Sequence, residues 1–292
     1  MTTFRGFPTA AAAATLFLIS ACANAGTSPI AGSAPSSSAP PAAGSADDLL
    51  LRVEQVGGFV APSMRSGRLP QISIYADGRV ITEGPVPAIY PGPALPNLQV
   101  VMIDPEQARA LAEKSAAAGV TEGTDFGQPG VADVPSTQVT AVTAAGRHTV
   151  AAEALNEARA NDSALTAAQQ AARTKLKAYL DDVNKITLTK IAPVQYKPEI
   201  IAAVVTPYVA TDDAVRPETI EWPGAALPGE PLAEGAELTC VTATGEQGDT
   251  VLAAAAKAKT NTAWGHGGNT WSIRFRPLLP DETGCADLKA GQ

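Results

Sequence analysis

Three cysteines carry the most specific chemistry that this sequence offers. Cys22 follows Ile19, Ser20 and Ala21, directly after an apolar stretch near the N-terminus. A branched apolar residue and two small residues before a cysteine are typical of a bacterial lipobox, where the chain is cut before the cysteine and its sulfur receives a lipid. The pattern predicts a lipoprotein signal peptide over residues 1–21 and lipid attachment at Cys22. An ordinary signal peptide, cut elsewhere, is the alternative.

The other two cysteines, Cys240 and Cys285, are expected to form a disulfide. An exported chain meets an oxidising compartment, where paired cysteines are usually joined. Two free thiols or a two-cysteine metal site are the alternatives. No His, Asp or Glu is spaced near either cysteine in a recognisable ligand pattern, so we expect no metal ion.

The sequence has two histidines, which limits both zinc chemistry and catalytic triads. His148 falls in a predicted hairpin and is interpreted as an exposed strand residue. His266 lies within Gly265–Asn269, between Trp264 and Trp271. This glycine-rich segment could line a binding site, or it could be a hairpin turn whose glycines take positive φ. We favour the turn.

Motifs of known catalytic sites are missing from the sequence. It has no Gly-x-Ser-x-Gly, no His-Glu-x-x-His and no P-loop. Asp125-Phe126-Gly127 matches three letters of a kinase metal motif, but the rest of that signature is absent. Glu122, Asp125 and Asp133 could bind calcium weakly, yet they lack the EF-hand spacing, which favours a solvated loop. We expect no catalytic residue and no cofactor, although sequence spacing cannot reveal the paired carboxylates of a glycosidase.

Five residues with ring side chains could form a ligand or partner surface. Tyr90 lies in a proline-rich stretch, Trp222 stands beside a proline, and Trp264, His266 and Trp271 surround the glycine-rich turn. Aromatic residues are enriched at interfaces. The alternative is that these few large side chains fill the core.

Composition limits the classes of partner. Hydrophobic residues make up 45% of the 292 residues, but aromatics only 5%, so alanine and valine must supply much of the core. The chain has 21 basic and 29 acidic residues, a net charge of −8, and no basic run. We therefore expect that the protein does not bind nucleic acid and makes no polybasic contact with anionic lipid. We expect it to contact the membrane only through the lipid anchor.

Low complexity marks the boundary between anchor and body. Residues 23–46 hold no charge and are rich in Ala, Ser, Pro and Gly, so residues 22–47 are predicted to be a lipidated tether. The rest divides into an N-terminal α+β subdomain at 48–190 and a C-terminal one at 191–292, which holds the disulfide. They form one body or two closely packed halves. No segment supplies the roughly 20 apolar residues of a membrane span.

Alternating apolar residues and turn signals predict an antiparallel first half. Asp77-Gly78 between alternating apolar residues is a strong hairpin signal. Five prolines make Gly84–Pro96 an irregular surface loop. The predicted strands are Leu49–Val56, Gln71–Tyr75, Arg79–Thr82, Leu98–Ile103, Thr137–Thr143 and His148–Ala152.

Two helices are predicted to cover these strands. Asp104 can cap a helix that starts at Pro105 and ends near Gly119. A second helix, about Ala164–Val183, shows apolar residues every three or four positions, which predicts one buried stripe. That stripe is Leu165, Ala168, Ala172, Leu176, Leu180 and Val183.

The second half repeats the mixture of strands and a helix. Asp249 is expected to cap a short helix over Thr250–Lys259, and Trp271–Phe275 is expected to be an edge or half-buried strand. Two further strands are predicted at Ile200–Val209 and at Glu237–Thr242, which carries Cys240. The predicted fold class is therefore α+β, with antiparallel sheets and a few covering helices.

A further set of motifs is spread over most of the mature chain: Ser73–Ile81, Tyr90–Leu98, residues 125–133, and Arg276–Glu282 with the nearby Cys285. In these motifs the chain resembles the uncharacterised lipoproteins found in many actinobacterial genomes. The resemblance implies location and class, and it implies no catalytic residue.

The expected function is that of an exported, membrane-anchored lipoprotein on the extracytoplasmic face of the cell membrane, a non-catalytic binding or envelope-assembly module. A small envelope hydrolase and a lipid or small-molecule carrier are the alternatives. A carrier needs a deep apolar cavity, an enzyme needs converging polar groups with shifted pKa values, and an interaction module needs an exposed apolar patch.

Overall fold

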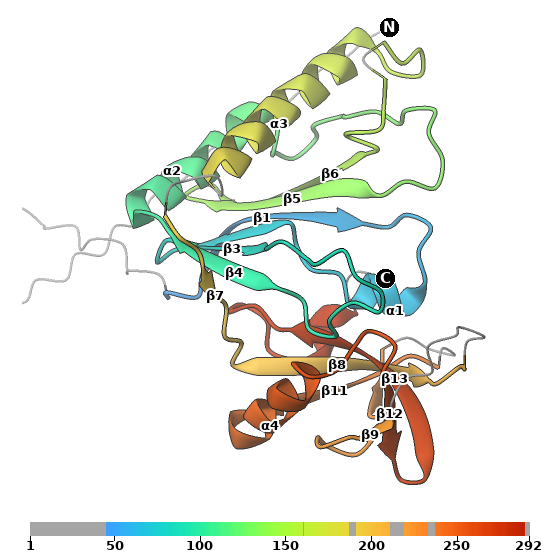
Figure 1. The fold of residues 1–292 in the computed structure, drawn as a ribbon. Coiled ribbons are helices and arrows are strands. Elements are labelled where there is room, and N and C mark those ends of the chain that lie inside the picture. Colours follow the sequence, from blue (N-terminus) through green and yellow to red (C-terminus); the bar gives the residue numbers. More distant parts are fainter. Residues whose placement is uncertain (1–44, 160, 187–190, 211–218, 233–236, 290–292) are drawn as a thin grey trace, which may run out of the picture. The chain divides into compact units, whose positions relative to one another are not determined.

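The computed structural model describes residues 45–159, 161–186, 191–210, 219–232 and 237–289, which belong to the compact unit Ala43–Gln292 (Figure 1). The predicted signal peptide, Cys22 and residues 22–44 of the predicted tether lie outside the described residues. So do residues 187–190, next to the predicted boundary between subdomains. No helix in the described part of the chain combines the length and apolar character that crossing a membrane requires.

The first half forms a seven-stranded sheet in the order β6-β5-β1-β2-β3-β4-β7, in which every neighbouring pair is antiparallel. Because strands and helices are segregated, the α+β class predicted from the sequence is confirmed. The strands are β1 (Leu49–Val56), β2 (Ile72–Tyr75), β3 (Arg79–Glu83), β4 (Leu98–Met102), β5 (Ser136–Thr143), β6 (Gly146–Glu153) and β7 (Val194–Gln195).

Glycine permits the predicted turn between β2 and β3. Gly78 has φ +91°, a conformation that favours residues without a Cβ. A Cβ at this position would lie about 2.1 Å from the carbonyl oxygen of Ile103, a clash that no rotamer relieves. The turn therefore requires glycine both for its backbone angle and for the close approach of the chain after β4.

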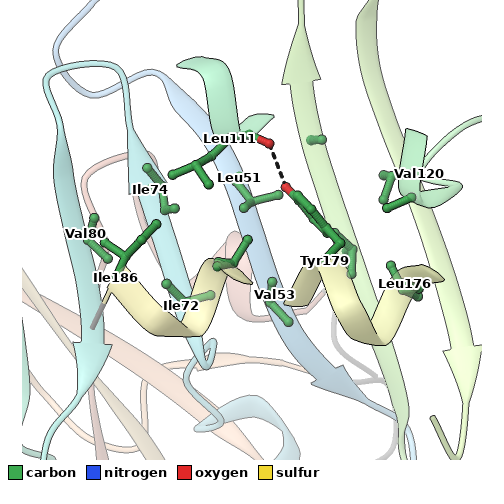
Figure 2. Close-up of a cluster of buried hydrophobic side chains, with 14 of the residues drawn as sticks. Leu51, Val53, Ile72, Ile74, Val80, Leu111, Val120, Leu176, Tyr179 and Ile186 are labelled. Atoms are coloured by element: carbon green, nitrogen blue, oxygen red, sulfur yellow. Dashed lines mark hydrogen bonds between the residues drawn. The ribbon is translucent and has the colours of Figure 1, made fainter. Parts of the chain in front are cut away.

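One face of this sheet is covered by α2 (Pro105–Lys114) and α3 (Ala167–Lys185). Figure 2 shows α3 crossing the strands. Leu176 and Ile186 belong to the same buried cluster as Leu51 and Ile74 of the sheet. Tyr179 donates its hydroxyl hydrogen to the carbonyl oxygen of Leu111 at 2.9 Å, which joins α3 to α2. The alternation of β1 places Leu51 and Val53 on this face, as their period of two predicts.

Both helices begin with side-chain caps. Asp104 accepts hydrogen bonds from the backbone N–H groups of Glu106 and Gln107, as the sequence predicts. Thr166 and Gln169 form a capping box at the start of α3. The α-helix α2 ends at Lys114, earlier than predicted, and a 3₁₀ turn, η1 (Ala116–Ala118), carries the chain to a left-handed residue at 119.

The buried stripe of α3 differs from the predicted one. Leu176 and Val183 are fully buried, as predicted, but Ala168 is exposed. Arg173 and Tyr179 take buried positions instead. A hydrophobicity pattern misses them because an arginine is buried only where the tertiary structure supplies acceptors for its N–H groups.

The acceptors for Arg173 lie in the loop after η1 and at the end of β6. Its guanidinium donates to the carbonyl oxygens of Phe126 at 3.1 Å, Glu153 at 2.7 Å and Ala154 at 2.7 Å. Burial lowers the pKa of Arg173 from its usual value, and the three charge-assisted hydrogen bonds offset that cost. One side chain of α3 thus fixes the chain after β6 and the loop after η1.

The second half forms a six-stranded sheet in the order β10-β11-β8-β13-β12-β9. Its neighbouring strands are antiparallel except β12 and β9, which run parallel. The elements are β8 (Ile200–Pro207), β9 (Thr219–Glu221), β10 (Glu230–Pro231), β11 (Thr239–Thr244), α4 (Gly245–Ala255), β12 (Ala263–His266), β13 (Asn269–Pro277) and the 3₁₀ helix η3 (Cys285–Leu288).

One prediction for this half was wrong. The helix begins at Gly245, with Thr244 at its N-cap position, so Asp249 lies inside α4 and does not cap it. The helix starts earlier than the capping signal predicts because Val251 and Ala255 are buried against the sheet, which favours helix on both sides of Asp249. Of the two alternatives for the strand around Trp271, the half-buried strand is the one observed, because β13 pairs with β8 on one side and β12 on the other and is therefore not an edge.

We expect Arg173→Met to lower the free energy of unfolding by about 3 kcal/mol, because it leaves buried carbonyl oxygens without donors. Urea unfolding followed by circular dichroism measures this loss. Lys175→Met, on the exposed face of the same helix, is the matched control and should change the value by no more than about 0.5 kcal/mol. Equal losses in the two variants would contradict the assigned role of Arg173.

Candidate functional site

A group of buried charged side chains lies where the segment after β13 meets the first sheet. Arg52 on β1 contacts Asp281 at 2.7 Å, and Tyr75 on β2 donates its hydroxyl hydrogen to the same carboxylate oxygen at 2.8 Å. Arg52 also donates to the hydroxyl of Ser73 at 3.2 Å. These residues lie on the sheet face opposite α2 and α3, because Arg52 alternates with Leu51 and Val53.

Electrostatics favour this ion pair over separate charges. Burial alone would lower the pKa of Arg52, but the nearby Asp281 and the surrounding acidic groups raise it. Burial raises the pKa of Tyr75 well above its usual range, so its hydroxyl stays protonated and donates. Tyr75 therefore serves as a hydrogen-bond donor and not as a base.

A second, more deeply buried ion pair lies beside the first. Arg276 on β13 contacts Glu282 at 2.7 Å, and the two side chains are 3% and 9% exposed. Glu282 also accepts a hydrogen bond from the backbone N–H of Leu279 at 2.7 Å, and Arg276 donates to the carbonyl oxygen of Arg68 at 3.2 Å. The pair therefore fixes the turn at residues 279–282 and attaches it to the chain before β2.

A cavity of about 160 Å³ opens between these groups and β1. Four arginines line it, and two of them, Arg65 and Arg68, contact no carboxylate among the described residues. Arg68 donates instead to the carbonyl oxygens of Gln55 and Gly57. Carboxylates also line the cavity, so its charges are largely compensated. The full set of charged lining residues is Arg52, Glu54, Arg65, Arg68, Arg276, Glu282 and Asp287.

The volume of the cavity limits what it could hold. At about 30 Å³ per water molecule, 160 Å³ is the space of roughly five waters. A polar lining of this size fits water or a small polar solute and does not fit an acyl chain. Within the described residues, no group of three or more His, Cys, Asp or Glu side chains is placed to hold a metal ion.

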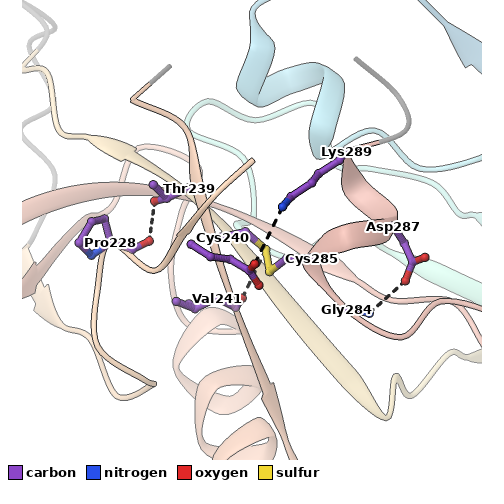
Figure 3. Close-up of a disulfide and its surroundings, with 9 residues drawn as sticks. Pro228, Thr239, Cys240, Val241, Gly284, Cys285, Asp287 and Lys289 are labelled. Atoms are coloured by element: carbon purple, nitrogen blue, oxygen red, sulfur yellow. Dashed lines mark hydrogen bonds and ion pairs between the residues drawn. A yellow bond between two sulfur atoms is a disulfide. The ribbon is translucent and has the colours of Figure 1, made fainter. Parts of the chain in front are cut away.

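Cys240 on β11 and Cys285 at the start of η3 are joined, with an S–S distance of 1.97 Å and a Cα–Cα distance of 5.9 Å (Figure 3). Both half-cystines are buried with Leu278 and Leu288. Asp287 accepts hydrogen bonds from the backbone N–H groups of residues 283 and 284, which closes the turn before η3. The disulfide thus attaches the segment that carries Asp281 and Glu282 to the second sheet.

Two of the five predicted surface residues lie in the core. Trp222 and Trp264 are 4% and 1% exposed, and their rings pack edge to face at 5.6 Å. Phe275 contacts both rings, at 6.2 and 5.5 Å between centroids. The indole N–H of Trp222 donates to the carbonyl oxygen of Ala225 at 2.7 Å. These tryptophans fill space that an alanine-rich sheet leaves open, so they cannot form a partner surface.

The glycine-rich segment is the hairpin turn between β12 and β13. His266 and Asn269 are paired across it, and Gly267 and Gly268 have φ +60° and +77°. His266 and Trp271 are half-buried, and among the described residues no hydrogen bond or ion pair joins His266 to another side chain. No catalytic cluster forms here.

The acidic loop expected to be solvated supports the start of α3. Asp125 accepts hydrogen bonds from the backbone N–H of Gly127 at 2.8 Å and from the side-chain amide of Gln169 at 2.8 Å. The Gln169 bond, followed by that of Gly127, lowers the pKa of Asp125. His148, on β6, is half-buried.

Tyr90 is the predicted surface residue that lies fully at the surface, at 74% exposed. It belongs to the proline loop, defined here as residues 84–97 between β3 and β4. Val86 and Ile89 in the same loop are 57% and 54% exposed. The sequence pattern predicts Tyr90 as a surface residue but not these two, although Val86, which lies between two prolines, carried a similar signal.

Hydrogen bonds hold the proline loop at both ends. At its base, the side-chain amide of Asn97 donates to the carbonyl oxygen of Pro85 at 2.9 Å. Further along, the backbone N–H of Ala94 donates to Ala258 at 3.1 Å, and that of Thr260 donates to Gly92 at 2.9 Å. Ala94 and Leu95 pack against the core of the second sheet. The loop therefore presents its exposed side chains on an anchored backbone.

No protein-family model, no curated protein and no solved structure matches this chain.

We expect Asp281→Ala to lower the free energy of unfolding by about 3 kcal/mol, because it leaves the buried guanidinium of Arg52 without its carboxylate. Chemical unfolding measures the loss. Asp182→Ala is the control, since Asp182 and Lys185 form an ion pair whose side chains are 69% and 71% exposed. That variant should change the value by no more than about 0.5 kcal/mol. A small effect of Asp281→Ala would show that the ion pair does not hold this junction.

We expect the double substitution Cys240→Ala and Cys285→Ala to cost about 4 kcal/mol, the chain-entropy value for a loop of 45 residues. Reduction of the wild-type protein should produce a similar loss, measured as a shift of the urea midpoint. The double variant should not respond to the reductant. A response of the variant would mean that reduction acts elsewhere.

Proposed function

We propose that this protein is an exported, lipid-anchored binding module of the cell envelope, without catalytic activity. The lipobox pattern at Cys22 and the uncharged segment after it support the anchor. The proposed contact surface is the exposed part of the proline loop, formed by Val86, Ile89 and Tyr90. It would bind an apolar surface of a protein partner on the extracytoplasmic face of the membrane.

The observation that carries this proposal is the exposure of three large apolar or aromatic side chains within five residues of an anchored loop. Contiguous exposed apolar residues often mark interaction sites. Prolines and the hydrogen bonds at both ends restrict the loop before binding, so less conformational entropy is lost when a partner docks. Tyr90 adds a polar atom to an apolar ring, a combination enriched at interfaces.

The buried polar groups support a non-catalytic function. In the described part of the chain, the most deeply buried ion pairs are Arg52–Asp281 and Arg276–Glu282. Each carboxylate already accepts hydrogen bonds from residues of its own junction, so these groups act between parts of the fold. The 160 Å³ cavity beside them is too small and too polar for an acyl chain. Two larger hollows, of about 640 and 750 Å³, are open to solvent and lined partly by charged side chains, unlike the deep apolar cavity of a carrier.

A photoreactive amino acid in place of Ile89, in the full chain in its own membranes, tests the contact surface. We expect one specific cross-linked protein, and about tenfold less product when Val86→Ser and Tyr90→Ser are added. The matched control carries the same photoreactive residue in place of Met102 on β4, which is 48% exposed and lies outside the loop.

The anchor is tested in the same experiment with Cys22→Ser. We expect this variant to leave the membrane fraction and to lose the cross-linked product. An equal yield of the same product from positions 89 and 102 would contradict the proposed surface. Retention of the Cys22→Ser variant in the membrane would contradict lipid attachment at that cysteine.

A further inference from the structure

The edge strand β6 is much longer than the other edge strands of the described residues. It spans eight residues, Gly146–Glu153, and is the outer strand of the first sheet (Figure 1). The other three outer strands, β7, β9 and β10, have only two or three residues. Short edges avoid pairing with other chains, whereas a long edge with free N–H and C=O groups is a template for another strand.

The register of the hairpin shows which backbone groups of β6 are free. Thr143 and Gly146 close the two-residue turn between β5 and β6, which makes them a hydrogen-bonded pair. Hydrogen-bonded pairs alternate with non-hydrogen-bonded pairs along the ladder. The even-numbered residues of β6 therefore direct their backbone N–H and C=O groups toward β5. The bond from the backbone N–H of Ala154 to Pro135 agrees with this parity. The odd-numbered residues of β6 therefore direct their N–H and C=O groups outward.

The free part of this edge runs from Arg147 to Ala151. No described strand pairs with its outer side, and Arg147, Thr149 and Ala151 are all exposed. Beyond it, the carbonyl oxygen of Glu153 already accepts a hydrogen bond from Arg173. Three residues thus offer a complete set of outward N–H and C=O groups, centred on Thr149.

The free edge is complementary to itself. An antiparallel copy centred on Thr149 would place Thr149 opposite Thr149 of the second copy, and Arg147 opposite Ala151, a long side chain beside a small one. Arg147 would then lie diagonally across from Glu153 of the other copy, within reach of long side chains. The two-fold axis repeats this contact between opposite charges. Neither an internal proline nor a lysine interrupts the strand.

We propose that two copies of this chain pair through β6, in antiparallel orientation about Thr149, to form one continuous sheet. Three hydrogen-bonded residue pairs join the copies, and the contacts between Arg147 and Glu153 fix the register. The anchored proline loop belongs to another part of the first sheet, between β3 and β4, so this pairing is independent of the surface in the proposed function.

Single cysteines in the full chain, in its own membranes, test the pairing and its register. We expect Thr149→Cys to give a disulfide-linked dimer under mild oxidation, because each residue 149 faces its own copy. Ala151→Cys is the matched control. It is equally exposed but faces Arg147 of the other copy, about 13 Å from the second residue 151 at 3.3 Å per residue, and should stay monomeric on a non-reducing gel.

Two further variants, made in the Thr149→Cys background, separate pairing from folding. Arg147→Glu, which places like charges across the axis, should lower the dimer yield roughly tenfold. Ala151→Pro should abolish the dimer while the hairpin persists, because the N–H it removes points away from β5. A dimer from Ala151→Cys but not from Thr149→Cys would overturn the register. Monomer alone, or a mixed disulfide with a different protein, would overturn pairing between copies.

Discussion

The pair formed by Arg52 and Asp281 is the interaction on which the arrangement of this fold depends. It joins β1 of the first sheet to a residue 229 positions later, beyond the last strand of the second sheet. Two buried charges are stable only when they meet with good geometry and further hydrogen bonds, and Ser73 and Tyr75 provide these bonds. The cost of separating the charges therefore makes one arrangement of the C-terminal segment strongly preferred.

The disulfide and the Arg276–Glu282 pair act on the same C-terminal segment from the opposite side. Cys285 is covalently joined to β11, and Glu282 accepts from both Arg276 and a backbone N–H. The segment is thus attached to the second sheet by the disulfide and to the first sheet by the carboxylate of Asp281, which contacts Arg52. Because its charged groups are used in this way, the geometry of the junction is structural, and the proposed binding surfaces lie elsewhere.

Those surfaces differ in the physical basis of recognition. The proline loop offers apolar side chains on a backbone that is fixed in advance, which suits an apolar protein partner. The edge of β6 offers backbone donors and acceptors, with Arg147 and Glu153 to select the register. One protein could use both at once, because the loop joins β3 to β4 whereas β6 lies at the outer edge beyond β5.

Local sequence patterns determined nine of the thirteen strands of the described residues, the capped start of α2, the hairpin at Gly78 and the α+β class, because each depends on neighbouring residues. They also predicted the pairing of Cys240 with Cys285, since these are the two cysteines outside the lipobox pattern at Cys22. They missed the short strands β7, β9, β10 and β12, which have four residues or fewer and form by pairing with other strands. Only the tertiary structure decided that Arg173 is buried, that Asp281 meets Arg52, and that Trp222 and Trp264 belong to the core. The reason is physical: burial of a charge or a large ring depends on partners contributed by distant segments, which spacing along the chain does not encode.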